Sequence, residues 1–174
     1  MKEGPTLIRK CPYCENLFKE PSLLSGNNFG AVYWTDGKQF APMLRDNIFI
    51  TRCKECKNYF WVEESKIVDT ISAPYFFIIK TEVDSDNRKY DEKCRQYSNV
   101  SVMYKLNFQE LFAAYKKLKI PSKDYEIYIL KQIWWAYNDI KRRGRNCGNC
   151  DFCVCITYLL NKLAKLLDDN DAIV

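Results

Sequence analysis

Apolar residues recur every three to four positions in three segments of the C-terminal part of the chain, which is the spacing of one face of an amphipathic helix. The first segment begins at Asn107, which forms a capping box with Glu110, and it ends before Pro121. The second segment runs over residues 123–143 and the third over residues 152–167. We therefore predict a C-terminal domain of three helices, arranged as helical hairpins like a short repeat array.

The first third of the chain instead has short apolar runs broken by turn residues, a pattern typical of β-strands. Residues 7–10 and 48–52 each lead into a tight turn, and apolar or aromatic residues follow both turns. Between these two units, residues 31–41 are predicted to form a β-hairpin, because Asp36 and Gly37 suit the positive φ angles of a type I′ turn.

A polar stretch separates the two patterns. Residues 80–99 are dense in charge and nearly free of aliphatic side chains, which indicates an exposed connection. The predicted fold is therefore α+β, with a β domain over residues 1–79, a polar connecting segment over residues 80–99 and a helical domain over residues 100–174.

Two Cys-x-x-Cys pairs, Cys11/Cys14 and Cys53/Cys56, occupy the two predicted turns. Similar residues flank both pairs, which argues against chance spacing among the nine cysteines of the chain. Four thiolates from two tight turns give the closed tetrahedral coordination of a structural zinc site, with no position left for a substrate. The sequence predicts an N-terminal zinc ribbon with an inserted hairpin and one structural Zn²⁺, the alternatives being iron in the same ligands or a redox-active dithiol.

The residue after each Cys-x-x-Cys pair is unusual for a zinc ribbon. Glycine commonly stands there, whereas this chain has Glu15 and Lys57. Both turns are therefore expected to accommodate a side chain.

The amino-acid composition limits both the cellular location and the kinds of catalysis that we expect of this protein. The odd cysteine count, the metal-like spacing and the lack of an opening signal segment favour a reducing, cytoplasmic location. No apolar run approaches the ~20 residues that span a bilayer, so no membrane insertion is expected. The chain has no histidine, which excludes Ser-His and Cys-His nucleophile pairs and His-ligated zinc, and it has no Gly-rich phosphate loop. We expect a protein that is not an enzyme.

Several stretches of the N-terminal part together resemble a known family. They are Cys11-Pro12-Tyr13-Cys14, residues 24–31, 34–38 and 41–44, Cys53-Lys54-Glu55-Cys56, and Phe60-Trp61. In them the chain resembles uncharacterised bacterial proteins that have an N-terminal Cys₄ zinc ribbon followed by tetratricopeptide-like helices. The resemblance covers the first 64 residues well and includes residues 133–139. It implies a fold and a metal, and it adds no catalytic residue.

Aromatic residues supply candidate contact sites. Trp34 and Phe40, with Lys38 between them, either pack over the small ribbon core, which we expect, or present a face to a partner. Trp135 lies on the polar side of its predicted helix, seven residues after Tyr128. It either docks against another part of the protein or anchors a partner.

Four cysteines lie close together between residues 147 and 155. Cys147, Cys150 and Cys153 could converge on a second metal, for which a fourth ligand would have to come from elsewhere, or two could form a reversible disulfide. The simpler expectation is that they are small core or loop residues.

Three classes of function are compatible with these features. The first, which we favour, is a non-enzymatic interaction or adaptor protein whose partner is another protein. The second is a nucleic-acid-binding ribbon, although the net charge of +5 is only weakly basic. Its phosphate-binding and base-stacking residues would be Lys10, Lys38, Arg52, Lys54, Tyr33 and Trp34. The third is a thiol or metal sensor that uses Cys147 to Cys155. The sequence leaves the oligomeric state open.

Overall fold

A computed structural model describes residues 2–72, 91–144 and 151–171 of the chain. The chain divides into two compact units, Met1–Lys105 and Leu106–Val174. The described strands lie in the first unit and the three long helices in the second, which confirms the predicted mixture of an N-terminal sheet and C-terminal helices. Among the described residues, no helix is both long and apolar enough to cross a bilayer.

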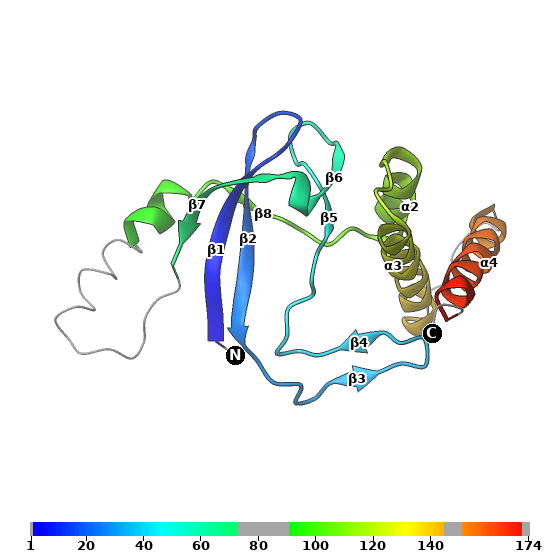
Figure 1. Cartoon of the computed structure of the whole chain (residues 1–174). Helices are drawn as coiled ribbons and strands as arrows, with labels where there is room; N and C mark the ends of the chain where they lie inside the picture. Colours follow the sequence, from blue (N-terminus) through cyan, green and yellow to red (C-terminus); the bar gives the residue numbers. More distant parts are fainter. Residues whose placement is uncertain (1, 73–90, 145–150, 172–174) are drawn as a thin grey trace. The chain divides into compact units, whose positions relative to one another are not determined.

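A four-stranded sheet forms the frame of the first unit (Figure 1). Its strands are β1 (Lys2–Lys10), β2 (Leu17–Ser25), β7 (Lys66–Ile71) and β8 (Ser101–Val102), in the order β7-β1-β2-β8. β1 pairs antiparallel with both β2 and β7, and the fully buried Ile8 lies at the centre of this pairing. β8 pairs parallel with β2.

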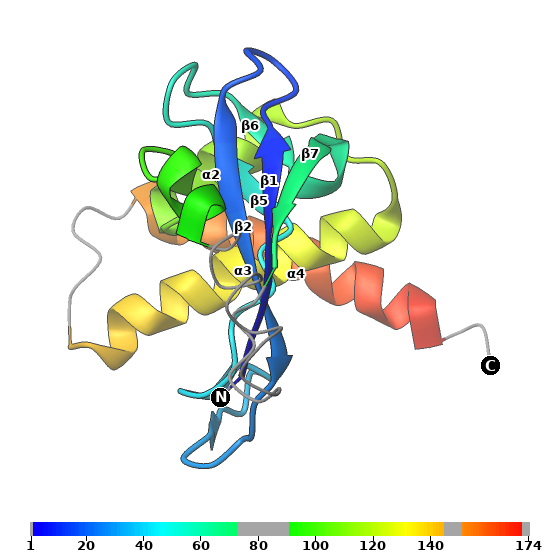
Figure 2. The same cartoon turned by 90° about the vertical axis from the view of Figure 1, so that its left-hand side faces the viewer.

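A second, smaller strand pair carries most of the aromatic core. β5 (Ile50–Arg52) and β6 (Tyr59–Trp61) pair antiparallel, and the short 3₁₀ helix η1 (Val62–Glu64) follows β6. All three residues of β6 are buried, and Phe60 packs with Phe18 of β2 at a ring-centroid distance of 5.6 Å. Two turns carry the Cys-x-x-Cys pairs: one joins β1 to β2 and the other joins β5 to β6. These two cysteine turns lie at the same end of the unit (Figures 1 and 2).

The inserted hairpin consists of β3 (Val32–Tyr33) and β4 (Gln39–Phe40), which pair antiparallel. The predicted type I′ turn is wrong, because Gly37 has a positive φ of 75° whereas Asp36 does not. Gly37 N–H donates to Trp34 O at 3.0 Å and Trp34 N–H donates to Lys38 O at 2.9 Å. The loop therefore has three residues and closes with glycine in the left-handed conformation.

The first unit extends to Lys105, so it includes residues that the sequence analysis assigned to the connecting segment and to the helical domain. Residues 91–96 are helical, and Lys93 and Tyr97 both bond to the Asp69 side chain on β7. The hydrogen bond from Lys93 lowers the pKa of Asp69 to about 2, with further help from the Thr70 amide and Tyr97. Residues 91–105 thus belong to the sheet unit, because side-chain bonds and the pairing of β8 tie them to it.

The second unit contains α2 (Phe108–Lys117), α3 (Lys123–Arg142) and α4 (Asp151–Asp171). The predicted capping box at the start of α2 is confirmed, since the Asn107 and Glu110 side chains each accept from the other's backbone N–H. α3 packs against both α2 and α4, and Ile129 and Ile133 are fully buried on it. The apolar periodicity therefore predicted the three helices of this unit.

Candidate metal centre

The two cysteine turns close with the same backbone hydrogen bond. In the first turn, Cys11 N–H donates to Asn16 O at 2.9 Å, and Glu15 N–H donates back to Cys11 O at 3.0 Å. In the second turn, Cys53 N–H donates to Asn58 O, also at 2.9 Å. Each turn is thus a six-residue loop between paired strands, which holds its two cysteines at one tip.

The backbone of both turns passes through the left-handed region directly after the second cysteine. Glu15 has φ 58° and Lys57 has φ 61°, and they are the non-glycine residues with positive φ in the described chain. Glycine favours this conformation because it lacks a Cβ. The side chains that the sequence placed at these two positions are therefore accommodated in strained backbone.

The four cysteines of the two pairs come together in space. Their Sγ atoms all lie within 4.8 Å of one another. The Cys11–Cys56 and Cys14–Cys53 sulfur distances are 3.8 and 3.6 Å, far longer than the ~2.05 Å of a disulfide. A tetrahedral site with Zn–S bonds of ~2.3 Å has sulfur atoms ~3.8 Å apart. The arrangement therefore fits a four-coordinate metal ion.

The thiols of the cluster sit in unequal environments. Burial raises the pKa of Cys11 to about 12 and also raises the pKa of Cys53. The backbone N–H of Asn16 lowers the pKa of the exposed Cys14 to about 7. Because metals bind thiolates, a metal ion has to displace protons from buried thiols here, and its binding should release protons.

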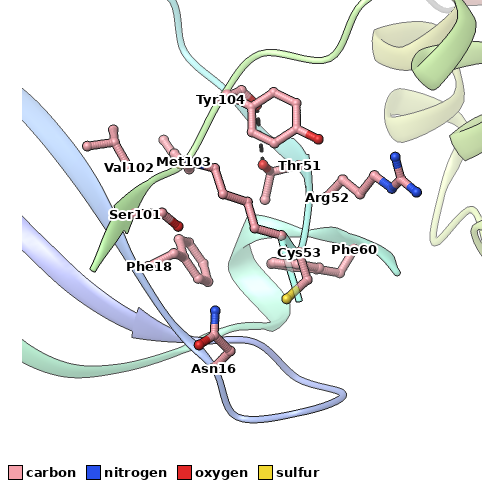
Figure 3. A pocket seen from close by; sticks show the side chains of 11 residues that line it. Asn16, Phe18, Thr51, Arg52, Cys53, Phe60, Ser101, Val102, Met103 and Tyr104 are labelled. Carbon is pink, nitrogen blue, oxygen red and sulfur yellow. Dashed lines mark hydrogen bonds between the residues drawn. The ribbon is translucent and has the colours of Figure 1, made fainter. Parts of the chain in front are cut away.

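Aromatic and aliphatic side chains border the cluster on one side. Cys11, Cys53, Phe18 and Phe60 form one buried group, against which Met103 packs. A shallow groove beside the second turn runs past Cys53 and Met103 (Figure 3). The Thr51 hydroxyl donates to Tyr104 O at 3.2 Å and so holds the segment after β8, which carries Met103, against this groove. Sequence reasoning missed Met103, because the strand that precedes it, β8, has two residues and is too short to show a periodicity.

The cationic residues proposed for nucleic-acid contact are in part engaged with the protein itself. Lys10 pairs with Glu15 at 3.1 Å. The Arg52 guanidinium lies over the Tyr59 ring and donates to Lys57 O at 3.0 Å. These internal contacts weaken the case for a phosphate-binding surface at the cysteine turns.

The expected packing of the hairpin aromatics over the core is wrong. Trp34 is 40% exposed and Phe40 is 58% exposed, while Lys38 is half-buried. The hairpin lies at the opposite end of β2 from the cysteine turns (Figures 1 and 2). Its side chains therefore cannot cover the core that surrounds the sulfur atoms.

The other candidate residues lie on the helices. Tyr128 and Trp135 are both half-buried on α3, so each retains some accessible surface. Cys147 and Cys150, and the side chain of Cys153, fall outside the described residues, while Cys155 is exposed on α4. A second thiol or metal cluster therefore stays a prediction.

Comparison with known proteins gave no relative for this chain. No protein family, curated protein or solved structure matches it. The four-cysteine cluster is thus the feature that bears most directly on function.

Proposed function

We propose that the protein is a non-enzymatic, cytoplasmic zinc-ribbon interaction or adaptor protein. One structural Zn²⁺, held by Cys11, Cys14, Cys53 and Cys56, stabilises its N-terminal unit. The observation that carries this proposal is the convergence of four sulfur atoms at nearly the spacing of a tetrahedral zinc site.

The donor set supports a structural role for the metal. Four thiolates complete the coordination of zinc and leave no position for a reacting water. Cys11 and Cys53 are almost fully buried within the aromatic core, so the metal would link two strand pairs from inside. Because the metal would have no open coordination position, the unit would act by binding a partner through its surface.

The test is native mass spectrometry of the freshly purified protein, combined with elemental analysis for zinc and iron. We expect one zinc per chain and no iron. The Cys14→Ser variant removes an exposed ligand and should lose the zinc, and Cys53→Ser should lose it as well. Cys155→Ser, at an exposed cysteine of α4, is the matched control and should retain one zinc. Iron in the wild-type protein, or full zinc occupancy in both ligand variants, would overturn the proposal.

A further inference from the structure

The segment from the last two residues of β2 to the start of β5 is rich in large apolar residues and buries none of them. We call this segment, residues 24–49, the insertion. No residue of it is buried, although it contains the hairpin β3–β4 and its flanking loops. Phe29 is 84% exposed and Tyr33 63% exposed. The exposed apolar surface of the insertion comprises Leu24, Phe29, Val32, Tyr33, Trp34, Phe40, Leu44 and Phe49.

The hairpin exposes apolar side chains on both of its faces. Val32 lies opposite Phe40, and Tyr33 lies opposite Gln39. Because successive side chains of a strand point to opposite faces, Val32 and Tyr33 lie on different sides of the hairpin. A two-stranded hairpin without a covered face is only marginally stable in water. The insertion therefore has the properties of a segment that another surface covers.

Charge does not favour a nucleic acid or an anionic membrane as that surface. The insertion contains two acidic and two basic residues. Arg45 pairs with Glu3 at 2.7 Å, Asp46 pairs with Lys105 at 2.8 Å, and the Asp36 side chain accepts from the Lys38 backbone N–H. Nucleic-acid binding requires a surplus of cations, whereas this balance allows two identical surfaces to meet without repulsion.

The exposed area is close to what a small dimer interface uses. An aromatic side chain buries about 150–250 Å² when fully covered, so the five exposed aromatic side chains, Phe29, Tyr33, Trp34, Phe40 and Phe49, offer on the order of 600 Å² per copy. Stable interfaces begin near this size for each partner. We propose that the insertion is the contact surface between two copies of this chain. The proposal rests on the proposed interaction function and names its partner.

Analytical ultracentrifugation of the zinc-loaded full chain, over a wide range of concentrations, tests this inference. We expect a species of twice the 20.6 kDa chain mass. The double variant Tyr33→Ser/Phe40→Ser removes two exposed aromatic anchors and should weaken the dimer at least ~100-fold. Phe29→Asp, which places like charges on both copies, should weaken it as well. Tyr158→Ser, at an exposed tyrosine of α4, is the matched control and should dimerise like the wild-type protein.

Zinc content measured on the same samples separates this inference from the proposed function. The hairpin β3–β4 lies at the opposite end of β2 from the cysteine turns, so the variants of the insertion should keep one zinc per chain. A zinc-loaded wild-type protein that stays monomeric at every concentration would overturn the dimer and leave the zinc-ribbon proposal standing. A dimer that survives both insertion variants would overturn the inference too, as would a dimer that only Tyr158→Ser disrupts.

Discussion

Glu15 and Lys57 hold the backbone of the two cysteine turns in a conformation that suits glycine. The left-handed region costs a residue with a Cβ about 1 kcal/mol or more. In each turn, the hydrogen bond from the first cysteine to the asparagine carbonyl closes the loop around the strained residue. The strand pairing and the cysteine spacing therefore impose the turn geometry, although Glu15 and Lys57 disfavour the left-handed conformation that it requires.

This conflict predicts that Lys57→Gly stabilises the protein. Glycine relieves the left-handed strain, and we expect the free energy of unfolding of the zinc-loaded protein to rise by about 0.5–1 kcal/mol. Urea unfolding followed by tryptophan fluorescence measures the change. Lys54→Gly is the control, because this lysine is exposed in the same turn and has no positive φ. It should lower stability, and equal effects of the two substitutions would contradict the explanation.

The sequence identified the sulfur cluster at the residue scale because Cys-x-x-Cys spacing fixes two ligands on one turn. It could not predict that Trp34 and Phe40 are exposed. The sequence shows that a residue is apolar, but it does not show whether the core of the same protein or another molecule covers its side chain. That depends on where the hairpin lies in the fold.

At the scale of elements, a polar cluster joins the three described helices of the second unit. Tyr115 of α2 donates to Glu126 of α3 at 2.8 Å, and Lys162 of α4 bonds to both. Burial raises the pKa of Glu126, but the hydrogen bonds from Lys162 and Tyr115 outweigh it and leave the pKa below its ordinary value. The ionised carboxylate therefore stabilises the helical unit.

We predict that Glu126→Gln lowers the free energy of unfolding of the helical unit by about 1 kcal/mol at neutral pH. The value is modest because Lys162 is partly exposed and solvent screens the pair. Because folding lowers the pKa of Glu126, its carboxylate stabilises the folded state at pH values above the ordinary carboxyl pKa, and this stabilisation is lost as the pH falls through the lowered pKa. The difference between variant and wild type should therefore shrink in acid. Urea unfolding followed by circular dichroism at several pH values measures this, with Asp124→Asn on the exposed side of α3 as the control. A difference that stays constant down to acidic pH would contradict the role of the charge.

Long elements were predictable and short ones were not. α2 and α3 follow directly from apolar periodicity over several turns. β8 has two residues and pairs parallel with Phe18 and Lys19, more than eighty positions earlier, so no local pattern could indicate it. The Asp-Gly dipeptide of the hairpin fits both a two-residue and a three-residue loop, and the pairing of Tyr33 with Gln39 selects the longer one.

At the scale of the whole molecule, the division into two units predicts that metal removal acts on one of them. The first unit has a small core built around Cys11, Cys53, Phe18 and Phe60, whereas the second has its own helical core. Treatment with a strong chelator should expose the buried Trp61 and red-shift tryptophan fluorescence, while the helical circular dichroism signal is largely retained. The Cys14→Ser variant should show the same spectra without chelator. Simultaneous loss of both signals would mean that the two units unfold together.

The return of β8 to the sheet sets the order in which the chain can fold during synthesis. All four cysteines of the cluster have been synthesised once Cys56 is added, but β8 and Met103 follow more than forty residues later. Because domains fold as they leave the ribosome, the nascent chain can capture its metal before its sheet is complete. The ion then restrains the two turns while the remaining residues are added, and the second edge of β2 stays open until Ser101 and Val102 arrive.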